Sequence, residues 1–93
     1  MSVSDRPHTT ACFSVLAHVD PGVMPRVLEL FAKRGLVPDR WHSSIAGPRQ
    51  DELHIDLEVA APMDLAERIA AAMRQQTEVR LVLMSEKLVA LSA

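Results

Sequence analysis

Residues 10–35, TACFSVLAHVDPGVMPRVLELFAKRG, hold the pattern of a strand, a tight turn and an amphipathic helix. In residues 10–19, apolar and other side chains alternate, which predicts a strand with one face in a core. The side chains expected to face inward are Phe13, Val15, Ala17 and Val19. The alternation stops at Asp20-Pro21-Gly22, where Asp is a preferred helix cap, Pro fits the first helical position and Gly permits a tight turn.

The helix that follows, residues 23–34, repeats its apolar residues at helical spacing. The predicted buried stripe consists of Val23, Val27, Leu30 and Phe31. We expect Gly35 to end this helix, because glycine adopts the left-handed backbone of a helix C-terminus at little cost. The first helix is therefore predicted to pack on the sheet through one stripe.

Four more elements are predicted toward the C-terminus. Residues 37–45 and residues 52–59 form a hairpin around a turn at Gly47-Pro48. The second arm alternates strictly, and its inward residues are Leu53, Ile55, Leu57 and Val59. Residues 63–76 are rich in alanine and predict a helix, and residues 79–84 are apolar on both faces and predict a fourth strand.

This order predicts an α+β fold of the ferredoxin-like βαββαβ type, a four-stranded antiparallel sheet with both helices on one face. The other face stays uncovered, and we expect Leu16, Val82 and Met84 to add apolar area to it. Because edge strands also invite pairing, we expect a homodimer. The expected boundaries are a flexible N-terminus at 1–9, the folded domain at 10–84 and a C-terminal tail at 85–93.

The composition limits the possible partners and compartments. The chain has 93 residues, enough for one domain, with a formal net charge of -2 that favours neither nucleic acid nor an anionic membrane. Cys12 is the single cysteine; we expect it to be a buried thiol in a reducing cytoplasm. No apolar run approaches the roughly 20 residues of a membrane helix, and no signal-peptide pattern opens the chain.

Several functions of the same topology are not supported by the residues. An RNA-recognition motif needs aromatic side chains on its central strands, and these strands offer only Phe13, directed toward the helices. If the hairpin loop has about three residues, His42 and His54 face each other and Asp56 could join them at a metal. We prefer to interpret these as solvated strand residues. Ser43 beside His42 points to the opposite face, so no catalytic residue, metal or cofactor is predicted.

The Asp20-Pro21-Gly22 loop allows two interpretations. It places the N-terminus of a helix, with its free N–H groups, at the end of a central strand, where a small carboxylate can bind. Alternatively, Asp20 only caps its own helix.

Two segments, FSVLAHVDPGVMPRVLELFAKRGLVPDRW (Phe13 to Trp41) and LEVAAPMDLAERIAAAMRQQTEVRLV (Leu57 to Val82), resemble an ACT domain. They are similar to the small regulatory subunits of acetohydroxyacid synthase (acetolactate synthase), especially the short isozyme II type. The resemblance implies a non-catalytic subunit that docks on a thiamine-diphosphate-dependent catalytic subunit and raises its activity. It also implies an amino-acid effector, valine in many members, bound between two ACT domains. The corresponding positions here are Asp20, Pro21, Gly22, Val23 and Val37.

The chain departs from the effector-binding members at two positions. They typically have Asn where this chain has Val19 and Val37, and a valine side chain cannot form a hydrogen bond to an amino-acid head group. Each lost hydrogen bond of a buried polar ligand costs about 1–3 kcal/mol. The N–H groups of Gly22 and Val23 remain, so we expect a weak or absent response to valine. The alternative is a stand-alone ACT-type sensor of an amino acid or other small molecule, acting as a homodimer.

Overall fold

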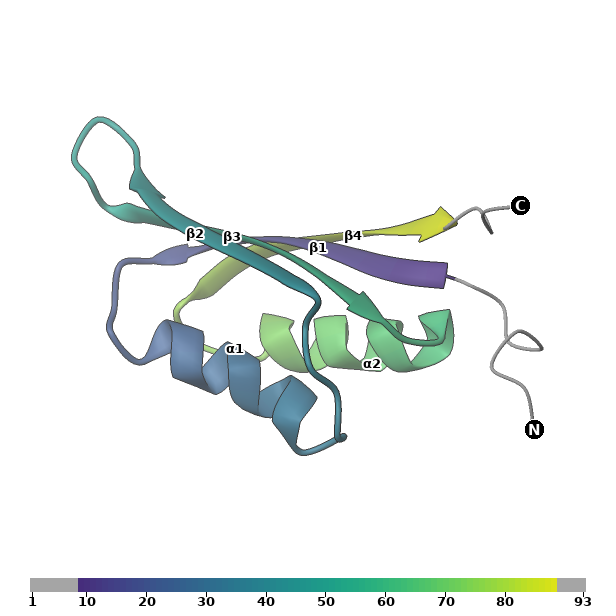
Figure 1. Cartoon of the computed structure of the whole chain (residues 1–93). Helices are drawn as coiled ribbons and strands as arrows, with labels where there is room; N and C mark the ends of the chain where they lie inside the picture. Colours follow the sequence, from purple (N-terminus) through teal and green to yellow (C-terminus); the bar gives the residue numbers. More distant parts are fainter. Residues whose placement is uncertain (1–8, 89–93) are drawn as a thin grey trace, which may run out of the picture.

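The computed structural model describes residues 9–88. The elements are β1 (Thr9–His18), α1 (Val23–Ala32), β2 (Arg40–Ala46), β3 (Glu52–Ala60), α2 (Met63–Arg74) and β4 (Val79–Leu88). The four strands pair antiparallel in the order β2-β3-β1-β4, and both helices cover one face of the sheet (Figure 1). The predicted ferredoxin-like βαββαβ fold is confirmed.

The core lies between the sheet and the two helices. The inward residues of β1 and β3 and the stripe of α1 are buried as the periodicity predicts, and the Phe13 and Phe31 rings meet edge to face at 5.5 Å. The buried apolar residues of the helices are Val23, Val27, Leu30, Phe31, Ala66, Ile69, Ala70 and Met73. Val19 was expected inside, but it is 43% exposed because β1 ends at His18. Val19 therefore lies outside the sheet, in the loop before α1.

The C-terminus of α1 closes at the glycine that the sequence indicates. Gly35 has φ of 70°, its N–H donates to the Ala32 carbonyl, and the Leu36 N–H donates to the Phe31 carbonyl, both at 3.0 Å. These two bonds form the Schellman motif, which satisfies carbonyls that the helix leaves unpaired. The regular helix stops slightly earlier than expected, at Ala32.

Two strand boundaries differ from the predictions. β2 begins at Arg40 rather than at residue 37, because residues 37–39 connect it to α1. β4 continues past Met84 to Leu88, since Cys12 and Thr10 pair with Ser85 and Lys87. Residues 1–8 of the predicted N-terminal segment and residues 89–93 of the predicted tail lie outside the described residues.

The prediction for the open face of the sheet was partly wrong. Val82 pairs with Val15, and Met84 pairs with Phe13. Paired residues of neighbouring strands share a face, so both side chains point to the helices; Val82 is buried and Met84 packs against the core. The apolar residues that β4 adds to the open face are Leu81 and Leu83, 47% and 58% exposed.

Among residues 9–88, no helix has the length and hydropathy needed to cross a membrane.

Candidate functional site

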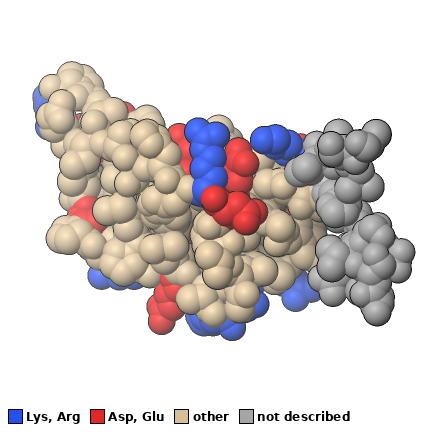
Figure 2. Space-filling view, in the orientation of Figure 1, with Lys and Arg blue, Asp and Glu red and all other residues tan. Residues whose placement is uncertain are grey.

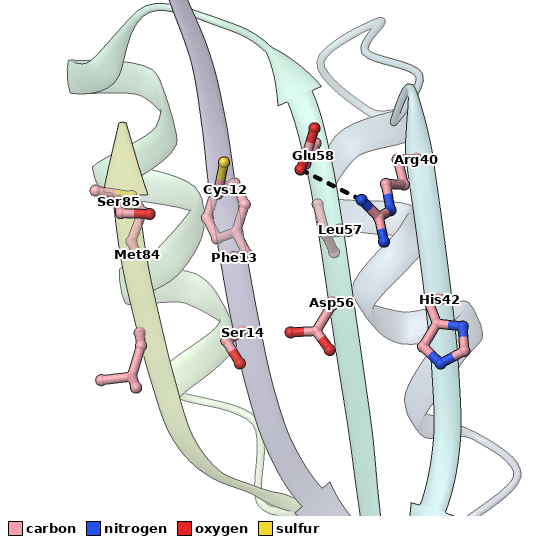
Figure 3. A pocket seen from close by; sticks show the side chains of 11 residues that line it. Cys12, Phe13, Ser14, Arg40, His42, Asp56, Leu57, Glu58, Met84 and Ser85 are labelled. Atoms are coloured by element: carbon pink, nitrogen blue, oxygen red, sulfur yellow. Dashed lines mark ion pairs between the residues drawn. The ribbon is translucent and has the colours of Figure 1, made fainter. Parts of the chain in front are cut away.

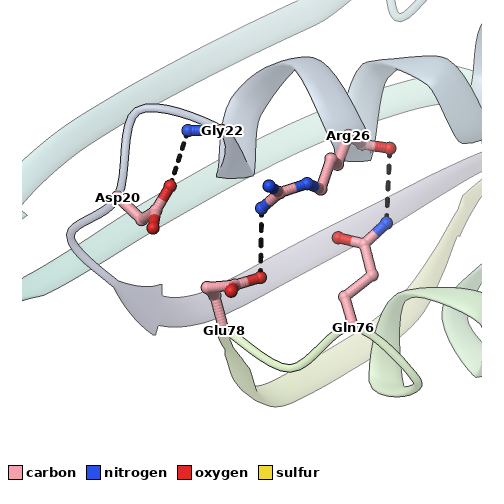
Figure 4. A network of polar contacts seen from close by, with 5 residues as sticks. All are labelled: Asp20, Gly22, Arg26, Gln76 and Glu78. Atoms are coloured by element: carbon pink, nitrogen blue, oxygen red, sulfur yellow. Dashed lines mark hydrogen bonds and ion pairs between the residues drawn. The ribbon is translucent and has the colours of Figure 1, made fainter.

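Two regions could hold a ligand or partner: the loop before α1, residues 19–23, and the open face of the sheet. In the loop, the Asp20 carboxylate accepts a hydrogen bond from the Gly22 N–H at 2.7 Å (Figure 4). The Asp20 carbonyl accepts a second hydrogen bond, from the Val23 N–H, at 3.1 Å. From the sequence, we expected these two N–H groups to be available to an effector. In the structure, both donate hydrogen bonds to Asp20. A ligand that used them would first have to break these bonds.

Arg26 covers this loop and ties it to the connection between α2 and β4. Its guanidinium lies 3.2 Å from the Glu78 carboxylate, and its carbonyl accepts a hydrogen bond from the Gln76 side chain at 3.3 Å (Figure 4). A Cβ atom placed on Gly22 would lie 2.9 Å from the Arg26 guanidinium carbon, so a larger residue there would displace this side chain. The sequence did not indicate this contact, because Arg26 and Glu78 are 52 residues apart.

The five residues carried over from the ACT resemblance do not meet within one chain. Asp20, Pro21, Gly22 and Val23 lie together at the N-terminal end of α1, whereas Val37 lies beyond the C-terminal end of this helix and is 80% exposed. A ten-residue helix is about 15 Å long, which separates the two groups. An effector that touches both groups would need Val37 from a second chain.

The histidines of the hairpin are not directly opposite one another. The connection between β2 and β3 spans residues 47–51 rather than three residues, and in the resulting register His42 faces Asp56 while His54 faces Ser44. The His54 Nε2 atom lies 3.1 Å from the Glu52 carboxylate. Within residues 9–88, no group of three or more His, Cys, Asp and Glu side chains could hold a metal ion.

The open face contains a shallow hollow of about 290 Å³ that reaches across all four strands (Figure 3). Two rows of cross-strand neighbours build it: Arg40, Glu58, Cys12 and Ser85 in one row, and His42, Asp56, Ser14 and Leu83 in the next. The short side chains Cys12 and Ser14 on the central strand β1, and Ser85 on the edge strand β4, line this hollow, which explains the depression. Cys12 is a free, half-buried thiol in this hollow rather than the buried residue that the sequence predicted.

Charges of opposite sign are mixed on this face. The two Glu58 oxygens lie 3.9 Å from an Arg40 nitrogen and 3.7 Å from the Lys87 ammonium, so this carboxylate joins β2 to β4 across β1. On the side drawn in Figure 2, blue and red side chains lie next to one another. Such pairs neutralise each other locally and leave no extended field of one sign.

No family model matches the sequence, and no curated protein matches it. Solved structures with the same fold include the ACT domain from GTP pyrophosphokinase of Chlorobium tepidum, at 12% identity and a TM-score of 0.66, over 82% of this chain and 96% of that chain. The acetolactate synthase small subunit from Thermotoga maritima matches at 26% identity and a TM-score of 0.69, over 81% of this chain and 46% of that chain. The fold is that of an ACT domain.

A domain that is not named as an ACT domain also has a similar structure. The C-terminal domain of the MgtC protein from Mycobacterium tuberculosis has a TM-score of 0.69 at 15% identity, over 98% of this chain and 100% of that chain. Proteins of several kinds thus share this architecture, and the fold alone does not select a partner. The choice among them depends on the surfaces described above.

Proposed function

We propose that this ACT domain is a regulatory, activating small subunit of acetolactate synthase, in branched-chain amino-acid biosynthesis. It docks on the thiamine-diphosphate-dependent catalytic subunit and contributes no catalytic residue of its own. The observation that carries this proposal is the similarity to the Thermotoga maritima small subunit over 81% of the chain at 26% identity. This chain spans 46% of that subunit's length. From the resemblance of residues 13–41 and 57–82, we also propose that it is of the short, isozyme II type.

Paired charges and exposed apolar side chains on the surface of the domain support a role in association with another chain. Two pairs of charged residues near the loop and the hollow neutralise each other, Arg26 with Glu78 and Arg40 with Glu58. Exposed leucines on β4 offer apolar area that a partner would cover. Both features suit a subunit that acts through contact with another chain.

The proposed subunit responds weakly or not at all to valine. Val19 and Val37 offer no hydrogen bond to an amino-acid head group, and the N–H groups of Gly22 and Val23 are bonded to Asp20. An effector would have to break these bonds without gaining side-chain partners, at about 1–3 kcal/mol for each polar group left unsatisfied.

The direct test is reconstitution of the enzyme. We expect that adding the purified chain to the thiamine-diphosphate-dependent synthase of the same organism raises the rate of acetolactate formation several-fold, and that the two chains co-elute in gel filtration. An unrelated ACT domain serves as the control. An unchanged rate at saturating amounts of this chain would refute the proposal. Isothermal titration then tests valine, and binding in the micromolar range would contradict the proposed weak response.

The alternative function is a homodimeric sensor of an amino acid or other small molecule. The loop at the end of a central strand and the separation of Val37 from it favour this alternative, because a site between two chains would reunite them. Thermal-shift screening against the common amino acids distinguishes the two functions. A large stabilisation by one amino acid, lost in Asp20→Ala, together with no activation of the synthase, would favour the sensor. Light scattering measures the homodimer that we expect in both cases.

A further inference from the structure

The hollow on the open face contains a carboxylate that no other described residue engages. Glu58 lies between Arg40 and Lys87, and Glu52 lies 3.1 Å from His54. In residues 9–88, neither a hydrogen bond nor an ion pair reaches the side chain of Asp56, although it is exposed and lines the hollow. An exposed carboxylate beside apolar surface is well placed to bind a positive charge from another molecule.

The neighbours of Asp56 suit a long, thin side chain. Asp56, Ser14 and Leu83 lie in one row across β3, β1 and β4, and Figure 3 shows the Asp56 carboxylate turned toward Ser14. Strands are about 4.8 Å apart, so Asp56 and Leu83 are about 10 Å apart, with only a serine between them. This spacing leaves room for one alkyl chain over Ser14.

We infer that the hollow accepts a lysine or arginine side chain of a protein partner, with Asp56 binding its charged end and Leu83 contacting its aliphatic stem. Lysine and arginine combine an apolar stem with a cationic tip, which matches a carboxylate next to an exposed leucine. A partner protein also explains the apolar strip beside the hollow, because Leu16 and Leu81 pair on the same face and a free amine would leave them uncovered. A metal ion is not supported, because the described residues offer no group of three ligands.

The site can be tested without knowledge of the partner. The full chain, labelled with ¹⁵N, is titrated with Nα-acetyl-lysine N-methylamide, and with the same compound acetylated on its Nε atom, which keeps the stem and removes the charge. We expect the charged probe to shift the amides of Ser14, Asp56 and Leu83 and to bind about threefold to tenfold more tightly than the neutral probe. Shifts spread evenly over the domain, or equal binding of the two probes, would overturn the proposal.

Variants separate the charge from the apolar contact. Asp56→Asn changes an exposed side chain at nearly constant size and should abolish the preference for the charged probe. Glu67→Gln, which removes a charge from the exposed surface of α2, serves as the matched control and should keep that preference. Leu83→Ser should weaken both probes by a similar factor. An Asp56→Asn chain that still prefers the charged probe would contradict the assignment.

The identity of the partner as the catalytic subunit rests on the proposed function, whereas the site itself does not. Under that function, Asp56→Asn should weaken binding to the catalytic subunit about threefold to tenfold, and Glu67→Gln should leave it unchanged. If the lysine probe binds in the hollow but the wild-type chain does not bind the synthase, the proposed function fails and the site stands. If Asp56→Asn instead converts a dimer to a monomer in light scattering, a second copy occupies the hollow and our assignment to a different protein is wrong.

Discussion

The two faces of the sheet carry different kinds of side chains on the same strands. On β1 and β3, the residues directed toward the helices are 0–4% exposed and apolar, whereas their direct neighbours in sequence, such as Ser14 and Asp56, are exposed and polar. Burial of the first set against the helices stabilises the fold through the hydrophobic effect. The second set can change at little cost in stability, and it is therefore the set available for binding.

The largest expected effect comes from neighbouring residues on opposite faces of β1. Phe13→Ala removes a ring that is 2% exposed and packs on Phe31, and we expect a loss of about 3–5 kcal/mol in the free energy of unfolding. Ser14→Ala, one residue along on the open face, should change it by less than about 0.5 kcal/mol. Urea unfolding followed by circular dichroism measures both values. Comparable losses in the two variants would contradict the division of the sheet into a core face and a free face.

A smaller loss in the free energy of unfolding is expected for substitutions on β4, where the sequence did not predict which residues face the helices. Met84 packs against the core, and a buried charge without a partner is unfavourable, so Met84→Asp should lower the free energy of unfolding by about 2 kcal/mol. Leu83→Asp introduces the same charge on the open face and should have less than half that effect. Thermal denaturation of both variants at one protein concentration tests this difference. The opposite order would show that β4 pairs with β1 in a different register.

The loop before α1 should contribute less than the core. Asp20→Ala removes the acceptor of the Gly22 N–H bond and should cost about 1 kcal/mol. Asp20→Asn keeps an acceptor oxygen and should recover most of the loss. Chemical denaturation compares the two variants. Equal destabilisation by both would mean that the charge of Asp20, rather than its hydrogen bond, stabilises the loop.

The smallest effect is expected for the ion pair between Arg40 and Glu58 on the open face. Their closest atoms are 3.9 Å apart and the Arg40 side chain is 69% exposed, so a double-mutant cycle with alanine should give a coupling energy below about 0.5 kcal/mol. The cycle is measured at low and high salt. A coupling energy above about 1.5 kcal/mol would show that the open face contributes to stability as well as to binding.

Much of the fold could be predicted from local patterns, whereas the site could not. The strict alternation of residues 52–59 and the stripe of α1 correctly gave the buried residues, because burial requires these periods in a strand and a helix. Residues 81–84 of β4 are all apolar, so this stretch has no period from which its inward side can be chosen. Pairing with β1 sets that side and directs Leu83, rather than Met84, to the open face. Asp56 was expected on the open face, but its cross-strand neighbours, His42, Ser14 and Leu83, are set by the register of the other three strands.

The amino-acid sequence by itself determined the order of strands and helices, the glycine that ends α1 and the identity of most of the core, because each depends on residues close together along the chain. The tertiary structure decided which residues meet across the sheet, among them His42 with Asp56, and which polar groups are already paired, as in Arg26 with Glu78. These contacts join segments far apart in the sequence. They depend on strand register, and a shift of one residue in register moves every side chain of a strand to the opposite face.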